Sequence, residues 1–281
     1  MLKIRNRRLD PVARQTLADV QKQINSSGNY PTRVARAKQE WERKRSTAAR
    51  KAAMTAVRET LSRMCIGSVR CAYCEDSAGD EVEHILPKNL FPERTFAWPN
   101  YAFSCGPCNG PKGNRYGVVQ GNSVQEFFRA RNGPVDPPPA GQSGFINPRT
   151  EDPTRFLELD LGGTTPQGQV LRGTFRYLPR PGLSPLDRAR TEFSCDVYGL
   201  NREIVRVARE NAFGGFRARL REYVTEKRGG ASSRRLREIR DDLLRTPHLT
   251  VFHEMRRQRS VLPQINAWLH EAPEAADWPL T

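Results

Sequence analysis

The sequence is poor in histidine, in acidic residues and in long apolar runs, and these shortages limit what the protein can be. Its 281 residues contain four histidines, and only His84 precedes residue 248. No apolar stretch approaches the ~20 residues of a membrane span, so no membrane partner is expected. Asp and Glu number 31 against 46 Lys and Arg, which gives a net charge of +15. This excess favours a polyanionic partner, and nucleic acid is the natural one.

Cysteine is also scarce, and nucleotide-binding motifs are missing. Six cysteines in a chain of this length are far below the density of a disulfide scaffold. No secretory signal is recognisable at the start of the sequence, so we expect a cytoplasmic protein whose thiols stay reduced. The sequence has no GxxxxGKS/T phosphate-binding loop, so any control by ATP must come from another subunit.

Four of the six cysteines form two short-spaced pairs, Cys71 with Cys74 and Cys105 with Cys108. Two Cys-x-x-Cys pairs can bring four thiolates into the tetrahedral geometry that structural zinc accepts. The alternative is two unrelated pairs of ordinary buried cysteines. We favour zinc because both pairs lie beside glycine or other residues that suit a turn.

Between the pairs, Glu83 and His84 lie in an alternating Val-Glu-His-Ile-Leu run that predicts a short strand. Alternation sends these two side chains to opposite faces of a regular strand. The strand must therefore end or twist here if both residues serve one site, and Pro87 supplies an end.

The order of these motifs resembles the zinc-clamped branch of the HNH nucleases, whose site is a β-hairpin followed by a helix around one catalytic metal ion. The motifs are Cys-x-x-Cys, Glu-His-Ile-x-Pro-Lys, Asn, and Cys-x-x-Cys-Asn-x-x-Lys. The resemblance implies that His84 is the general base that activates water. It also implies that Glu83 and Asn109 are ligands of the catalytic metal, where family members often carry histidine or aspartate. Asn100 would brace the loop and orient His84.

Phosphodiester hydrolysis agrees with this assignment. The reaction needs a deprotonated water and a cation that stabilises the developing negative charge. A histidine with a pKa near 6.5 can accept that proton at neutral pH. The oxygen donors of Glu83 and Asn109 suit Mg²⁺ or Mn²⁺ better than zinc, so two metals are expected. Lys88 and Lys112 are candidates to hold phosphates, with solvated surface lysines as the alternative.

The charge excess is concentrated at the N-terminus. Residues 1–70 hold 17 Lys and Arg against 5 Asp and Glu, which accounts for +12 of the total. We favour a phosphate-contacting role for this region, because the bias has one sign and lies beside the predicted nuclease. A docking surface for an acidic protein is the rival interpretation.

Helix, turn and composition signals divide the chain into four regions. They are a basic helical N-terminal arm (1–66), the zinc-clamped HNH nuclease domain (67–132), a proline-rich connector with a β-hairpin (133–183) and a helical C-terminal region (184–281).

Local signals make more detailed predictions within these regions. Asp10 and Ser184, each followed by proline, predict helix starts. We further expect one long helix from Thr32 towards Met64, a helical piece from Ser123, and a poorly ordered end from Ala272 onward.

Motifs in the second half extend the resemblance. Phe145-Ile-Asn-Pro148, Glu151-Asp-Pro153, a hairpin and a helix ending in Tyr198-Gly-Leu-Asn-Arg202 are similar to the C-terminal extension of HNH nucleases from the Septu anti-phage system and related retron modules. This kinship implies a role in antiviral defence and a partner ATPase of the SMC/ABC type that restrains or licenses cleavage.

The sequence thus predicts an α+β protein, helix-rich around a zinc-stabilised ββα-metal nuclease core. The predicted activity is metal-dependent cleavage of nucleic acid, with DNA favoured over RNA. The alternative is a non-catalytic zinc-knuckle module that binds nucleic acid or serves as an adaptor. Zinc and positive charge suit that alternative equally, but it has no need of Glu83, His84 and Asn109 in one motif.

Overall fold

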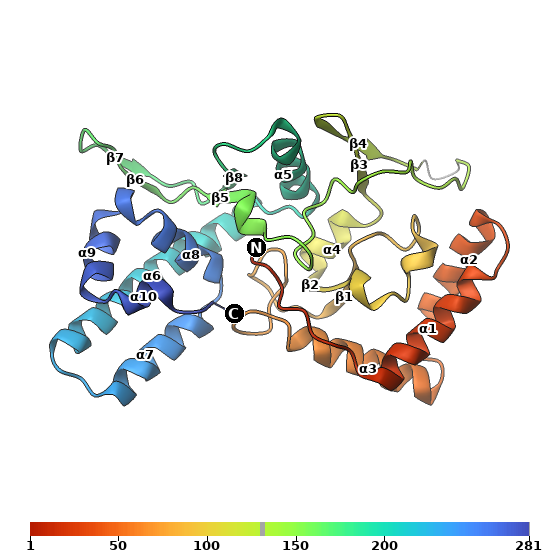
Figure 1. The fold of residues 1–281 in the computed structure, drawn as a ribbon, viewed down its shortest axis with the longest axis horizontal. Helices are drawn as coiled ribbons and strands as arrows, with labels where there is room; N and C mark the ends of the chain where they lie inside the picture. The colour runs from red at the N-terminus through yellow and green to blue at the C-terminus, as the bar shows by residue number, and fades with distance from the viewer. Residues whose placement is uncertain (130–132, 281) are drawn as a thin grey trace.

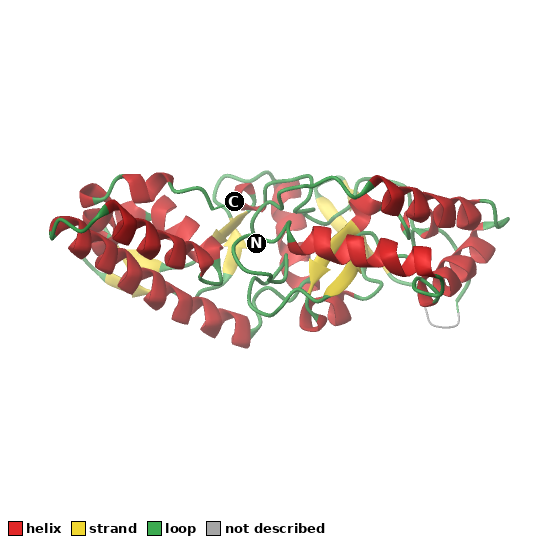
Figure 2. Cartoon of the chain, turned by 90° about the horizontal axis from the view of Figure 1, so that it is seen from below, coloured by secondary structure: helices red, strands yellow, loops and turns green. Residues whose placement is uncertain are grey.

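The computed structural model describes residues 1–129 and 133–280. The molecule is elongated in both views, with the N-terminal helices at one end, the C-terminal helices at the other and the β1–β2 hairpin between them (Figure 1, Figure 2). The predicted domain boundary after residue 132 falls on residues 130–132, which lie outside the described part of the chain. The four regions therefore remain a prediction.

The N-terminal arm consists of three helices, α1 (Pro11–Asn25), α2 (Tyr30–Glu42) and α3 (Ala48–Ser62). Helix α1 begins as predicted, because the Asp10 side chain accepts a hydrogen bond from the Ala13 amide at 2.9 Å. The single helix predicted from Thr32 to Met64 is wrong. Residues 43–47 offer no apolar side chain to bury, and Thr47 caps a new helix by accepting from the Arg50 amide.

A strand–strand–helix unit forms the centre. Strand β1 (Glu81–His84) pairs antiparallel with β2 (Tyr101–Ser104), and helix α4 (Gly106–Lys112) follows directly. The loop between the strands contains two short 3₁₀ helices, η1 (Pro92–Arg94) and η2 (Trp98–Asn100). The arm packs against this unit, and α3 lies against β2.

A second hairpin replaces the helical piece predicted from Ser123. Strands β3 (Tyr116–Gln120) and β4 (Ser123–Phe127) pair in register from Tyr116 with Phe127 to Gln120 with Ser123. The two-residue turn between them is Gly121-Asn122, and Gly121 has φ +59°. Such a turn matches the twist of antiparallel strands and outweighs the weak helical spacing of the apolar residues.

The hairpin predicted within residues 133–183 is present as two separate ladders. Strand β5 (Leu157–Leu159) follows the 3₁₀ helix η3 (Pro153–Arg155) and pairs with β8 (Tyr177–Pro179). Strand β6 (Gly162–Thr164) pairs with β7 (Val170–Arg172) in the second ladder.

Helices fill the C-terminal region. They are α5 (Pro185–Val197), α6 (Glu203–Arg228), α7 (Ser233–Arg245), α8 (Leu249–Arg257), η4 (Arg259–Val261), α9 (Pro263–Glu271) and α10 (Glu274–Asp277). The predicted cap at Ser184 is confirmed. The predicted poor order from Ala272 is wrong for the described residues, because Ala275 and Trp278 are buried and Trp278 packs on Tyr223 with ring centroids 4.8 Å apart.

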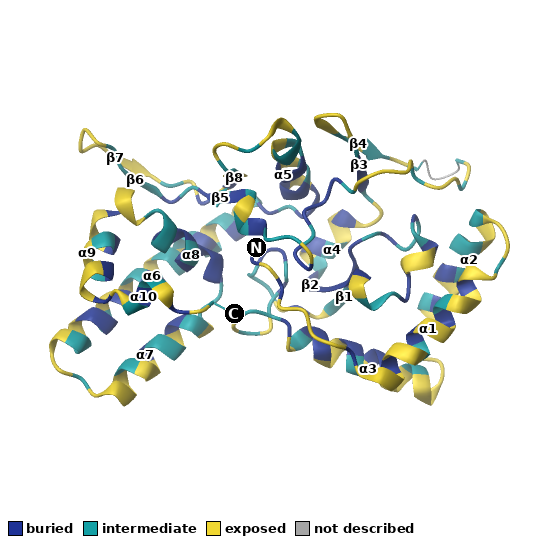
Figure 3. Cartoon of the chain, viewed as in Figure 1, coloured by how far each residue is buried: buried dark blue, intermediate teal, exposed yellow. Residues whose placement is uncertain are grey.

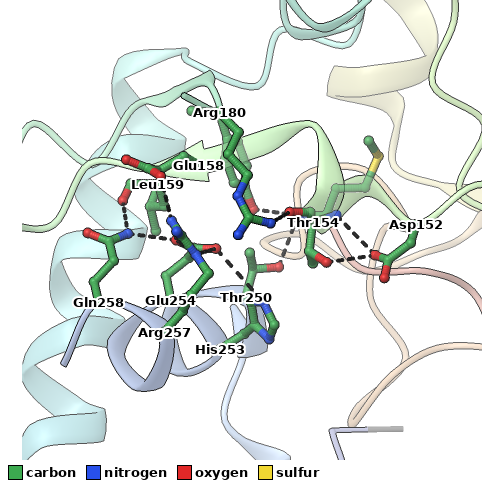
Figure 4. Close-up of polar contacts among 12 residues, drawn as sticks. Asp152, Thr154, Glu158, Leu159, Arg180, Thr250, His253, Glu254, Arg257 and Gln258 are labelled. Carbon is green, nitrogen blue, oxygen red and sulfur yellow. Dashed lines mark hydrogen bonds and ion pairs between the residues drawn. The ribbon is translucent and has the colours of Figure 1, made fainter. Parts of the chain in front are cut away.

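A buried carboxylate ties helix α8 to strand β5. Glu254 is fully buried and accepts hydrogen bonds from Arg257 and Gln258 on its own helix (Figure 4). Arg257 also pairs with Glu158, and Gln258 donates to the Leu159 carbonyl at 2.8 Å. Each member of this network has a charged or polar partner. The network therefore holds α8 and β5 together and leaves no polar group free to bind a ligand.

Two apolar clusters share the central hairpin (Figure 3). One joins the arm helices to Phe96, Tyr101 and Phe103. The other joins the four paired cysteines to the C-terminal helices. Helices mixed with small antiparallel sheets confirm the predicted α+β class. Among the described residues, none of the helices is both long and apolar enough to cross a membrane.

Candidate functional site at the end of strand β1

The predicted zinc ligands come together. Cys71, Cys74, Cys105 and Cys108 are buried, and their Sγ atoms all lie within 4.8 Å of one another. Zinc–sulfur bonds of about 2.3 Å in a tetrahedron give sulfur–sulfur edges of roughly 3.8 Å. The Sγ atoms of Cys74 and Cys105 are 3.7 Å apart. Four thiolates this close would repel one another without a cation, so the cluster fits structural zinc.

The motif at the end of helix α5 packs directly on this cluster. Arg202 donates to Cys108 Sγ at 3.4 Å and to the Pro107 carbonyl. Tyr198 stacks on Tyr73, which lies inside the first cysteine pair, with ring centroids 3.9 Å apart and planes 13° from parallel. Groups around metal ligands orient them, so the C-terminal region helps to shape the central unit.

His84 is the last residue of β1 and is 7% exposed. Its Nε2 lies 2.9 Å from the Thr95 carbonyl oxygen, and its ring contacts Trp41 edge-to-face with centroids 4.3 Å apart. Burial, followed by the charge of Lys88, lowers the pKa of His84 to about 3. A carbonyl oxygen can only accept, so we assign the proton to Nε2 and the free lone pair to Nδ1. The imidazole is therefore neutral at pH 7, but a pKa this far below the expected 6.5 makes it a weaker proton acceptor in this buried setting than the sequence predicted.

Glu83 points to the other face of the strand and is 1% exposed. Its Oε2 accepts a hydrogen bond from the Tyr73 hydroxyl at 2.6 Å. Its Oε1 lies 2.6 Å from Lys112 Nζ, in an ion pair without hydrogen-bond geometry, and has no hydrogen-bond donor in the described part of the chain. This oxygen is already paired with a cation, so it could ligate a divalent ion only if the Lys112 pair opened.

Asn109 lies on helix α4 and faces a carboxylate that the sequence did not single out. Its Nδ2 donates to Glu81 Oε2 at 2.7 Å. Glu81 and Glu83 share one face of β1 because strand side chains alternate. Gly106 leaves room for this contact, since a β-carbon there would lie 3.3 Å from Glu81 Oε1. Glu81 could have been found from the sequence, because residues two apart on a strand share a face and Glu81 lies two residues before Glu83.

Asn100 occupies a bracing position in the loop after β1. Its Oδ1 accepts from the Leu86 amide at 2.8 Å, and its Nδ2 donates to the carbonyls of Leu86 and Arg94 at 3.0 Å. Its own carbonyl accepts from the Ile85 amide at 2.9 Å. These four bonds fix the backbone on the C-terminal side of His84, in keeping with the bracing role that the resemblance implies.

The two candidate phosphate-binding lysines lie in different settings. Lys112 is 1% exposed; it pairs with Glu83 and donates to the His84 carbonyl at 2.8 Å. In this arrangement its ammonium is an internal counter-ion, and a phosphate could reach it only if the Glu83 pair opened. Lys88 is half-buried, and burial together with the charges of Lys44, Lys112 and Lys38 lowers its pKa.

The structure thus brings together some predicted site residues and separates others. Glu83, Lys112 and the backbone of His84 meet on the α4 side of β1, with Asn109 next to Glu81. The imidazole of His84 lies on the arm side, against Trp41. Trp41 and Tyr73 were missed because a residue's neighbours across separate elements leave no local pattern in the sequence.

Acid should destabilise the fold through His84. The unfolded side chain binds a proton below its ordinary pKa of about 6.5, whereas the folded one stays neutral down to about pH 3. The unfolded state then binds more protons, so stability falls as the pH drops through this window. From pH 6.5 to pH 5 the loss is about 2 kcal/mol, at about 1.36 kcal/mol per pH unit.

Urea unfolding of wild type and His84→Gln at pH 7 and pH 5 measures this effect. Any loss of zinc in acid is common to both proteins, so the difference between them isolates His84. We expect the wild type to lose more stability than the variant. Equal losses would mean that the imidazole is solvated.

Comparison with known proteins gives a partial match. No protein family model matches the chain. Over 49 residues the sequence is 45% identical to the Septu protein PtuB of Bacillus thuringiensis. The match covers 16% of this chain and 19% of that protein, so the chain spans about a fifth of the length of this relative. The similarity therefore concerns one segment of each protein.

Proposed function

We propose that the protein is a metal-dependent HNH endonuclease that hydrolyses phosphodiester bonds of nucleic acid. The observation that carries the proposal is the strand–strand–helix unit beside the four-cysteine cluster. It places His84 at the end of β1 and Asn109 on α4, with Glu83 adjacent to His84 in sequence but on the opposite face of the strand. The predicted order of motifs thus coincides with one small folded unit.

Mg²⁺ or Mn²⁺ would be held by Glu83 and Asn109, with Glu81 as a further carboxylate at the same face. All the donors are hard oxygen atoms, and Glu83 Oε1 becomes available to the cation when its pair with Lys112 opens. When bound, the cation would stabilise negative charge on the reacting phosphate. In this structure the Lys112 ammonium supplies the positive charge beside Glu83. The ion pair between Lys112 and Glu83 must open before a metal ion can bind.

His84 would accept the proton of the attacking water through Nδ1. The Thr95 carbonyl holds the opposite nitrogen, and Asn100 fixes the backbone that follows. These bonds restrict rotation of the ring, so the base needs little reorganisation when a substrate binds.

The net charge of +15 supports a polyanionic substrate, and we favour DNA over RNA. The partial match to a Septu protein supports a role in anti-phage defence. The resemblance to Septu nucleases implies an ATPase partner, and we propose that an SMC/ABC-type ATPase subunit controls cleavage and that both proteins act in the cytoplasm.

One observation favours a second candidate, a zinc-knuckle module that binds without cutting. His84 lies beneath Trp41 and Glu83 is paired with Lys112, so neither group is open to a substrate in this arrangement. A binding module needs no access to either residue.

Incubation of purified protein with plasmid DNA and with structured RNA, in Mg²⁺, Mn²⁺ or EDTA, separates the two candidates. We expect cleavage that needs the divalent ion and is lost in EDTA. Glu83→Gln keeps the size of the side chain but removes its charge, so it should weaken Mn²⁺ binding at least about tenfold in calorimetry and slow cleavage at low metal concentration. Mn²⁺ binding that is unchanged by Glu83→Gln would remove Glu83 from the site.

If the isolated chain is inactive, the same assay is repeated with an SMC/ABC-type ATPase that copurifies with it. Metal-independent binding with no cleavage in either form would favour the zinc-knuckle module.

A further inference from the structure

The end of helix α2 covers the candidate base. Trp41 is the penultimate residue of α2, and its ring packs on the His84 imidazole. Lys44 lies just beyond the helix, with Nζ 4.8 Å from the centroid of the Trp41 ring. The arm therefore contributes a wall to a site whose other residues all come from the central unit.

Buried contacts hold the end of α2, which forms this wall, in place. Glu40 is buried and pairs with Arg36 on α2 at 2.7 Å and with Arg50 on α3 at 2.6 Å. Ala37 is fully buried in the arm's apolar cluster. Helix α2 is thus held against α3, and Trp41 against His84, while Lys44 Nζ donates to the Trp41 carbonyl at 3.2 Å.

Three lysines gather at this wall. Lys38 is exposed one helical turn before Trp41, and Lys44 and Lys88 are half-buried. The charges of Lys38 and Lys44 both act on Lys88. Within residues 1–129 and 133–280, none of the three lysines has a carboxylate within ion-pair distance; Glu42 is the acidic residue whose charge acts on Lys44 and Lys88.

This unbalanced charge contrasts with the C-terminal helices, where basic side chains are paired with carboxylates. Examples are Arg219 with Asp242, Lys227 with Glu274, Arg228 with Glu271 and Arg235 with Glu222. Clustered lysines repel one another and destabilise the folded chain unless a polyanion binds. The cluster beside His84 is therefore matched to an anionic partner.

We infer that Lys38, Lys44 and Lys88 bind consecutive phosphates of a nucleic acid strand beside His84, and that Trp41 withdraws from His84 when the strand binds. This inference rests on the proposed function, since it concerns the substrate of the same site. A phosphodiester backbone is favoured over an acidic protein because the cations surround the predicted base for phosphodiester cleavage. The end of α2 would then both bind the substrate and cover His84 when no substrate is bound.

Binding in EDTA tests the lysines without any need for cleavage. Fluorescein-labelled DNA and RNA duplexes are titrated with wild type, Lys38→Ala, Lys44→Ala, Lys88→Ala and the triple variant, at several KCl concentrations. The matched control is a triple variant at Lys3, Lys22 and Lys51, exposed arm lysines whose loss changes the net charge equally. We expect each single substitution to reduce the slope of log affinity against log salt by about 0.9 for a DNA duplex.

The triple variant at the wall should bind at least about tenfold more weakly than the triple control. Equal affinities of the two triple variants would overturn the inference, as would failure of the wild type to bind either duplex. Specific weakening at the wall, with no metal-dependent cleavage by the chain alone or with the ATPase, would support the binding surface and overturn the proposed nuclease activity.

Tryptophan fluorescence tests whether Trp41 moves away from His84 when nucleic acid binds. Addition of the duplex should shift the emission of the wild type, because the Trp41 ring leaves a buried contact. Trp41→Phe keeps an aromatic ring at the position and should lose this shift when enough duplex is added to saturate the variant. An emission shift that persists in Trp41→Phe, or no shift in a wild type that binds, would overturn the movement of Trp41.

Discussion

Replacing His84 with alanine is expected to abolish detectable cleavage while the fold and the bound zinc are retained. A general base contributes about 100- to 10,000-fold to a rate, and His248, the next histidine along the chain, faces Asp76 beside the first cysteine pair instead of the end of β1. The fold should tolerate the change because the Thr95 carbonyl, which Nε2 contacts, also accepts from the Tyr101 hydroxyl at 2.7 Å. No carbonyl is left without a donor.

Initial rates on plasmid DNA, with circular dichroism and zinc content as folding controls, measure this effect. His270→Ala is the matched control, because His270 is exposed on α9 and bonds only to the Asn266 carbonyl of its own helix. Cleavage by His84→Ala at the wild-type rate would remove His84 from the catalytic role.

The second large effect is expected at the cysteine cluster. Cys105→Ser should reduce bound zinc from about one equivalent to almost none and lower the unfolding temperature by at least about 10 °C. Structural zinc contributes about 10–16 kcal/mol to small metal-dependent folds, which matches or exceeds the ~5–15 kcal/mol stability of a typical domain. Each kcal/mol corresponds to about 2–4 °C in a chain of this size.

The loss should spread beyond the cluster. Tyr198 and Arg202 pack on Tyr73 and Cys108, so the C-terminal region loses its support when the cysteine loops open. Metal analysis and thermal unfolding are the measurements, with Cys65→Ser as the control. Cys65 lies outside the cluster, and its thiol is close to the Leu61 and Arg70 carbonyls, which a serine hydroxyl can also reach. Full zinc content in Cys105→Ser would show that the cluster does not hold the ion.

Local signals predicted those parts of the fold that depend on neighbouring residues. The caps at Asp10 and Ser184 were readable because a short polar side chain followed by proline favours a helix start in almost any context. The cysteine pairs were readable because two thiols of a Cys-x-x-Cys turn can face one ion. Predictions from apolar spacing alone were weaker, and the turn at Gly121-Asn122 made a hairpin of the helix expected after Ser123.

The sequence by itself determined the α+β class, the four cysteines of the cluster and the presence of Glu83, His84, Asn100 and Asn109 in one short segment. Only the tertiary structure decided how those side chains are used. Strand alternation places Glu83 towards Lys112 and His84 towards Trp41, and both contacts join elements far apart in the chain. Such contacts depend on how separate elements pack, which no local pattern of residues encodes.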